Sequence, residues 1–144
     1  MARTMTDQEV VAFLTSDPPH TGKLATTRAD GRPHVAPIWF ARDDDGALWF
    51  TTGADTVKGR TIRREPRVSM CVDDERPPFT FVVLDGTAEV VEDADLLLHW
   101  ATVVGGRYMG AERAEEYGKR NAVAGELLIR FRPQHVTAIK DIAD

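Results

Sequence analysis

The sequence predicts a single domain, residues 1–144, that is mainly β with a few flanking helices. We expect six to seven antiparallel strands in a closed or nearly closed barrel, because most strand-like runs follow one another through short turns. Helical patterns are too sparse for a doubly wound parallel sheet, which needs a helix after nearly every strand. Closing the sheet into a barrel also removes exposed edges. No repeat or linker divides the chain, whose length is typical of one domain.

A capping box predicts a short helix near the N-terminus. Thr6 is followed three residues later by Glu9, so each side chain can bond to the other's backbone N–H group. Apolar residues continue from Val10 to Leu14. We expect Pro18 and Pro19 to end the helical pattern.

Three strands joined by turns are predicted next. The runs GKLATT and PHVAPIWFA flank an Asp30-Gly31 turn, which favours a hairpin. A second turn at residues 43–46 leads into ALWFTT. The expected strands therefore span residues 22–27, 33–41 and 47–52.

A short, very basic helix is predicted between the third strand and the fourth. Its segment gathers five cations within ten residues, in a protein of formal net charge -5: Lys58, Arg60, Arg63, Arg64 and Arg67. Further strands are expected at residues 67–72, 79–84 and 87–91. Asp85-Gly86 would form a turn or bulge between the last two.

The C-terminal third predicts two helices and two strands. Apolar residues at spacings of three and four predict a helix over residues 93–104, which Gly105-Gly106 is expected to break. A more polar helix is expected at 111–119. The final strands are predicted at 127–131 and 135–142.

Composition and absent motifs argue against several function classes. The negative net charge disfavours general nucleic-acid binding. No stretch approaches the roughly 20 apolar residues of a membrane span, and the first residues lack an apolar signal core, so we expect a cytoplasmic protein without membrane contact. There is no P-loop and no G-x-S-x-G motif, and the four histidines lack metal-ligand spacing. Neither a catalytic side chain nor a metal site is predicted.

The basic segment favours binding of a specific anion such as a phosphate. Lys and Arg donate charge-assisted hydrogen bonds, and backbone N–H groups at a helix start add to them. The alternative is an ordinary amphipathic helix, with Arg63 and Arg67 in water and Ile62 buried. Trp39 and Trp49 could each cover a flat ring or pack in the core.

Three segments, in this order, resemble the split β-barrel flavin-binding family, which includes pyridoxamine 5'-phosphate oxidases. They are LATTRADGRPHVAPIWF, LWFTTGADTVKGRTIRREPRVSMCVDDE and FTFVVLDGTAEVVED. The resemblance covers about residues 8–140 and is nearest to the actinobacterial branch that uses the deazaflavin coenzyme F-420. It implies an FMN-binding split β-barrel and a homodimer with cofactor sites at the subunit interface.

The same resemblance implies which residues contact the cofactor ring. The return strand of the first hairpin meets the polar edge of the ring, which corresponds to Pro37, Ile38 and Trp39. The end of the third strand contacts the ring or the ribityl chain, which corresponds to Thr51 and Thr52.

Other positions correspond to the family's phosphate site and to its subunit contact. The lysine of the basic helix, Lys58, is implied to bind the cofactor phosphate, with Arg60 and Thr61 as further candidates. The segment before the G-T-A strand reaches the partner's cofactor, which corresponds to Pro78 and Phe79.

One position departs from the family's pattern. Many relatives have a second basic residue two positions before the lysine, where this chain has Thr56. This departure favours F-420 over FMN, because F-420 has a phosphodiester and an acidic tail that suit cations spread along a groove. Arg63, Arg64 and Arg107 are the candidates for that tail.

The function that the resemblance implies is an F-420-dependent reductase, which transfers a hydride from the reduced cofactor to a conjugated small molecule such as a quinone or biliverdin. Such a reaction needs no catalytic side chain, because the cofactor supplies the reactive carbon. The alternatives are an FMN-dependent enzyme like pyridoxamine 5'-phosphate oxidase and a non-catalytic protein that binds a flavin, F-420 or haem.

Overall fold

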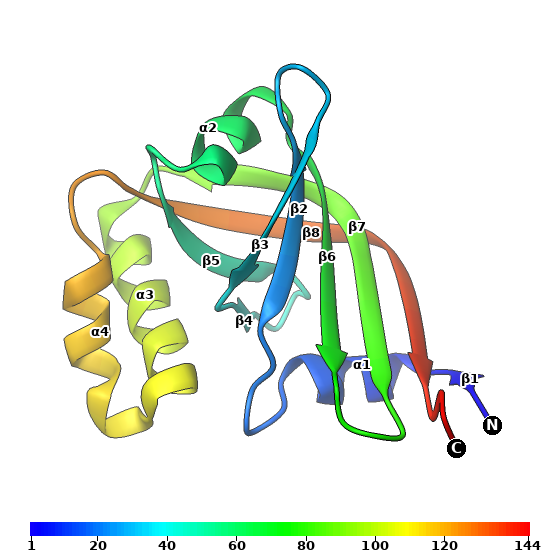
Figure 1. The fold of residues 1–144 in the computed structure, drawn as a ribbon. Helices are drawn as coiled ribbons and strands as arrows, with labels where there is room; N and C mark the ends of the chain where they lie inside the picture. The colour runs from blue at the N-terminus through cyan, green and yellow to red at the C-terminus, as the bar shows by residue number, and fades with distance from the viewer.

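In the computed structural model, which describes residues 1–144, one antiparallel sheet curls into a half-open barrel (Figure 1). This confirms the mainly β split barrel expected from the sequence. The hydrogen-bonded order is β3-β2-β6-β7-β8-β5-β4, and β1 pairs with β8. The strands are β1 (Arg3–Thr4), β2 (Gly22–Thr27), β3 (Pro33–Ile38), β4 (Ala41–Arg42), β5 (Leu48–Gly53), β6 (Arg67–Asp74), β7 (Thr80–Val91) and β8 (Glu126–Lys140).

Four α-helices flank the sheet. They are α1 (Asp7–Leu14), α2 (Val57–Arg64), α3 (Ala94–Met109) and α4 (Ala114–Asn121), with one 3-10 turn at Ala111–Arg113. Helix α2 lies at one end of the barrel and α1 at the other, while α3 and α4 lie side by side against one flank (Figure 1). None of these helices has both the length and the apolar character that crossing a bilayer requires.

The barrel has a seam where its sheet does not close. Strands β3 and β4 are the two ends of the hydrogen-bonded order, yet only Trp39 and Phe40 separate them in the chain. Phe40 is fully buried, together with Phe50 of β5 and Phe131 of β8. The core therefore supports the seam from inside. The edge of β3 and the part of β5 beyond its short pairing with β4 stay available to line a site.

Strands β7 and β8 are longer than the sequence patterns predicted. Residues 79–84 and 87–91 were expected as two strands, but they form one strand with a register shift between Asp85 and Gly86. A Cβ atom at Gly86 would overlap the carbonyl oxygen of Arg132 on the neighbouring strand. Glycine thus permits the close approach that bends the strand without ending it. The segments 127–131 and 135–142 likewise join into β8.

The expected break of the first C-terminal helix at Gly105-Gly106 was wrong, because α3 continues to Met109. A Cβ atom at Gly105 would overlap Cβ of Tyr117, and one at Gly106 would lie 2.8 Å from Cβ of Ala114. Both glycines therefore lie where α4 packs closely on α3. Helix packing outweighs their low helix propensity.

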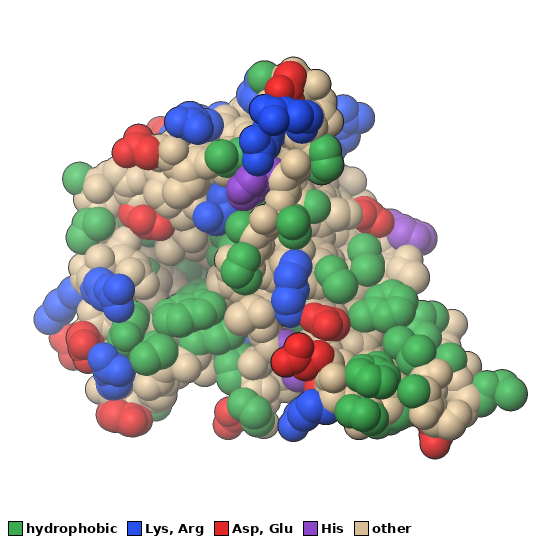
Figure 2. Space-filling model, in the orientation of Figure 1, with side chains coloured by type: hydrophobic (Ala, Val, Ile, Leu, Met, Phe, Trp, Pro, Cys, Tyr) green, Lys and Arg blue, Asp and Glu red, His purple; other side chains and the backbone are tan.

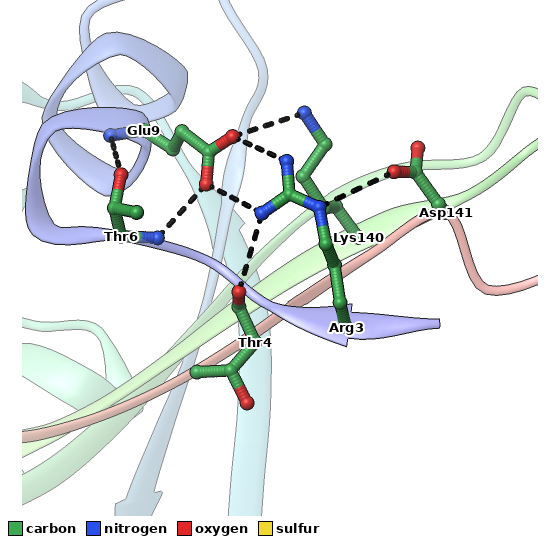
Figure 3. A network of polar contacts seen from close by, with 6 residues as sticks. All are labelled: Arg3, Thr4, Thr6, Glu9, Lys140 and Asp141. Carbon is green, nitrogen blue, oxygen red and sulfur yellow. Dashed lines mark hydrogen bonds and ion pairs between the residues drawn. The ribbon is translucent and has the colours of Figure 1, made fainter. Parts of the chain in front are cut away.

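The predicted capping box at the start of α1 is present and belongs to a larger polar network (Figure 3). The Thr6 N–H group donates to Glu9 at 2.8 Å, and the Glu9 N–H group donates to the Thr6 hydroxyl at 3.2 Å. Arg3 of β1 and Lys140 of β8 approach the same carboxylate at 2.6 Å and 3.5 Å. The network ties α1 to both ends of the chain.

Glu9→Gln is expected to flatten the loss of stability in acid. The side-chain bond from Arg3, with the Thr6 N–H group, lowers the pKa of Glu9 from 4.5 to about 2. A lowered carboxyl pKa contributes stability that is present above the unfolded pKa and is lost as the pH falls through the folded one, here from about 4.5 to about 2. Melting temperatures over this range check the prediction. Glu75→Gln, at a carboxylate without an ion pair, is the matched control. Parallel curves for the wild type and Glu9→Gln would contradict it.

Candidate functional site

A pocket of about 510 Å³ opens along the seam of the barrel, between the edge of β3 and the edge of β5. The pair of helices α3 and α4 supplies its remaining wall, and the surface is hollowed between this pair and the barrel (Figure 2). Its lining residues are Thr21, Pro37, Ile38, Trp39, Thr51, Thr52, Gly53, Lys58, Ala101, Val104, Asn121 and Glu126.

The junction between β5 and α2 fixes one end of this pocket. Thr56 is the N-cap of α2, and its hydroxyl accepts from the Gly59 N–H group at 3.0 Å. The same hydroxyl donates to the Gly53 carbonyl at 2.8 Å and lies 3.0 Å from the hydroxyl of Thr52. Thr56 therefore holds the start of the helix against the end of the strand.

Lys58 is the cation of the pocket. It lies in the first turn of α2, lines the cavity and forms no ion pair or side-chain hydrogen bond with the rest of the chain. The first N–H groups of a helix have no acceptor within the helix, and the positive end of the helix dipole lies there. An ammonium group and free N–H donors together suit the oxygens of a phosphate.

Trp39 forms a fixed wall of the pocket. Its ring stacks on Tyr108 of α3, with a centroid distance of 5.3 Å and an angle of 4° between the planes. The Tyr108 hydroxyl accepts from the Phe40 N–H group at 3.3 Å and donates to the His20 carbonyl at 2.7 Å. The Trp39 N–H group has no acceptor within the chain, so this part of the pocket offers a free backbone donor.

The two tryptophans have different roles. Trp49 is 5% exposed, donates from Nε1 to Asp43 at 2.8 Å and stacks on Trp100 of α3 at 5.0 Å. It therefore belongs to the packing between barrel and helices, whereas Trp39 faces the pocket.

The cations predicted for an acidic tail are engaged elsewhere. Arg107 is partly buried and donates to the carbonyls of Phe40 at 2.6 Å and Leu14 at 2.7 Å, so its expected role in a ligand site is corrected to a structural one. Arg63 pairs with Glu92 at 3.3 Å. The guanidinium of Arg64 donates to a backbone carbonyl at 2.6 Å.

Six of the ten cofactor-binding candidates come together in the pocket: Pro37, Ile38, Trp39, Thr51, Thr52 and Lys58. The other four lie outside it. Arg60 is exposed on α2, and Thr61 is 3% exposed, on the side of that helix that packs on the core. Pro78 and Phe79 lie in the turn between β6 and β7, at the end of the barrel away from α2 (Figure 1).

Sequence reasoning missed the pocket residues that come from α3, α4 and the start of β8. Glu126 is the most consequential of them, because it places a carboxyl group in the same cavity as Lys58. Burial raises the pKa of Glu126, while Thr51 and Lys58 partly oppose this shift. Glu126 lies directly opposite Gly53 in the pairing of β5 with β8. The sequence alone does not show that these two strands pair, so it could not place Glu126 in the pocket.

The chain is similar to known proteins in both sequence and fold. The family model described as pyridoxamine 5'-phosphate oxidase matches residues 6–140. A 5a,11a-dehydrotetracycline/5a,11a-dehydrooxytetracycline reductase of Streptomyces rimosus is 36% identical over 77 residues, which cover 49% of this chain and 54% of that protein. The chain spans about half the length of the curated relatives it matches.

Two solved structures extend the similarity. A conserved hypothetical protein of Mycobacterium tuberculosis has a TM-score of 0.80 at 29% identity, over 93% of this chain and 84% of that one. A solved F-420 reductase has a TM-score of 0.63 at 30% identity, over 82% of this chain and 89% of that one.

Proposed function

Because the chain belongs to the pyridoxamine 5'-phosphate oxidase family, we propose that it is an F-420-dependent reductase that acts on a conjugated small molecule in the cytoplasm. The observation that carries the proposal is the pocket at the seam, where Lys58 and the start of α2 lie at the end of a groove lined by β3 and β5. Similarity to a reductase and to an F-420 reductase supports this choice.

The residues of the pocket fit such a cofactor. Lys58 and the N–H groups of Val57 and Lys58, which have no acceptor within the chain, would hold its phosphodiester. The segment from Pro37 to Trp39 would lie along the ring, and the free Trp39 N–H group would donate to the polar edge of the pyrimidine portion. Thr51 and Thr52 would contact the ring or the ribityl chain.

When bound and reduced, the cofactor supplies the hydride. The protein's residues orient the ring, limit water on the side of Trp39 and leave space for a flat acceptor between the barrel and α3. No side chain is required to donate a proton, which solvent can deliver.

Titration of the apoprotein with F-420 and with FMN, side by side, tests the proposal. We expect tighter binding of F-420 and a holoprotein absorbance maximum at about 420 nm, against about 450 nm for a flavin. Tight binding of FMN alone would favour the oxidase alternative. Binding without turnover of any quinone, biliverdin or nitroaromatic acceptor would favour a non-catalytic carrier.

Glu126→Gln is expected to tighten binding of the anionic cofactor by roughly three- to tenfold at pH 8, because it removes a carboxylate that shares the pocket with Lys58. The pKa of Glu126 is raised by burial, so wild-type affinity should increase as the pH falls and this group becomes neutral. The gap between the two proteins should close over the same range. Calorimetry at several pH values measures both effects. A constant gap, or weaker binding by the variant, would place Glu126 outside the site.

We also propose that the protein is a homodimer whose subunits share the cofactor sites. Val35 is 67% exposed on the outward face of the sheet, opposite Ala25 in the register, and hydrophobic side chains gather on this face over β6 and β7 (Figure 2). Phe79 is another exposed apolar side chain. Such surfaces favour association.

Sedimentation at micromolar concentration is expected to give the mass of a dimer. Val35→Glu should shift the protein toward monomer and weaken cofactor binding in parallel, because a charge buried at an interface is costly. A fully active wild-type monomer would exclude a shared site.

A further inference from the structure

The inner face of the β2–β3 hairpin contains three buried polar atoms without a partner. They are Oγ1 of Thr26, Nε of Arg28 and Nδ1 of His34. Thr26 and His34 lie directly opposite each other in the register, and Arg28 follows two residues after Thr26 on the same face. Most buried polar groups in proteins have a hydrogen-bond partner, so three unpaired ones together require an explanation.

The remaining nitrogen atoms of Arg28 and His34 also lack partners within the chain. Both side chains are half-buried, and neither forms a hydrogen bond or an ion pair within the chain. Asp30 at the tip of the hairpin bonds to Arg32 at 2.8 Å, and Arg28 acts on it only through its charge, which adds to the lowering of the Asp30 pKa. The hairpin therefore holds two nitrogen-bearing side chains against the protein, and neither has a hydrogen-bond partner within the chain.

This face continues into the pocket at the seam. His34, Ala36 and Ile38 alternate along the same face of β3, and Ile38 lines the pocket. The distance along the strand from His34 to Ile38 is about 13 Å, at roughly 3.3 Å per residue. Ala36, between them, is small.

Helix α2 covers the same end of the hairpin. The guanidinium of Arg64 donates to the Thr27 carbonyl at 2.6 Å, which holds the end of α2 beside β2. Lys, Arg and His side chains gather over α2 and this hairpin (Figure 2). A ligand that extends from the pocket past Lys58 would therefore meet the hairpin face.

We propose that Thr26, Arg28 and His34 form a second anion subsite, which binds the acidic tail of the cofactor beyond the phosphodiester. This inference rests on the proposed function and adds the residues that recognise the distal end of the ligand.

Three substitutions to glutamine test the subsite. Arg28→Gln and His34→Gln remove the proposed contacts, and Arg32→Gln is the matched control, since it removes a charge from the same hairpin at a residue already paired with Asp30. Fluorescence polarisation should show F-420 binding at least fivefold weaker in the first two variants and unchanged in the control.

Ligands of different length show which part of the cofactor, the ring, the phosphate or the tail, these residues contact. FMN, which has a phosphate but no tail, and the deazaflavin riboside, which has neither, should bind all variants within about twofold of the wild type. If the variants lost as much affinity for the riboside as for F-420, the ring site would be damaged and the proposal would be overturned. An equal loss of affinity for FMN would also overturn it, because the residues would then belong to the phosphate site.

The wild-type protein provides a measurement that needs no substitution. The imidazole resonances of His34 should shift on addition of F-420 and stay in place with the riboside. If the wild type binds F-420 but these resonances and both variant affinities are unchanged, the subsite is wrong and the proposed function stands. If the wild type binds neither F-420 nor FMN, the proposed function fails together with it.

Discussion

Lys58→Ala is expected to weaken cofactor binding by about 1–3 kcal/mol, which corresponds to a roughly five- to 150-fold higher Kd. Lys58 lines the pocket at the start of α2 and has no carboxylate partner that would hold its charge elsewhere. Its removal leaves only backbone N–H donors for the phosphodiester. Isothermal calorimetry with F-420 measures the change directly.

A surface lysine provides the control for this substitution. Lys119→Ala removes the same charge from α4, where the side chain pairs with Glu115 at 3.1 Å on an exposed surface. Affinity should be unchanged there, which separates a local contact from the effect of net charge. An unchanged Kd in Lys58→Ala would remove this residue from the site.

Gly59→Ala is expected to lower the free energy of unfolding by about 1–3 kcal/mol and to weaken cofactor binding at least tenfold. A Cβ atom at this position would overlap the carbonyl oxygen of Gly53 and lie 3.1 Å from the Thr56 hydroxyl. Alanine is the better helix former, so the loss would come from α2 being pushed off the end of β5. The displaced helix would move Lys58 away from the pocket.

Gly53→Ala tests whether this effect comes from the helix contact. A Cβ atom at Gly53 would meet only the Thr56 methyl group, at 3.4 Å, which is ordinary van der Waals contact. Urea denaturation should therefore give nearly wild-type stability for Gly53→Ala and a clear loss for Gly59→Ala. Equal stabilities would mean that the helix tolerates the added methyl group.

Most strands of the barrel were predictable because the turns that join them are encoded by residues next to one another in the sequence. The Asp30-Gly31 turn has Gly31 at φ 86°, a conformation that favours glycine, and it joins β2 and β3 as expected. One error lies at the seam, where the single strand predicted over residues 33–41 divides into β3 and β4. Two others arose where glycine acts through packing between elements. Gly86 bends one strand instead of separating two, and Gly105 lies inside a helix because Tyr117 packs against it.

The candidate site was only partly accessible from sequence for a similar reason. Residues on β3, β5 and the start of α2 follow a continuous pattern that the family resemblance reaches, and six of them line one pocket. Asn121 and Glu126 enter the same pocket from a remote helix and strand, whose placement depends on the register of β5 with β8. The sequence also could not show that Arg107 donates hydrogen bonds to two backbone carbonyls that are remote from it in the chain.

The close packing of α3 on α4 has an evolutionary consequence. Both helices lie in the single connection between β7 and β8, and they contact each other through glycines and small side chains more intimately than they contact the sheet. Mutations in α3 or α4 change the pocket wall that these helices form, while every strand keeps its hydrogen-bonded neighbours. A scaffold of this kind can therefore change the shape of one pocket wall through a single insertion, while the wall formed by β3, β5 and the start of α2 stays the same.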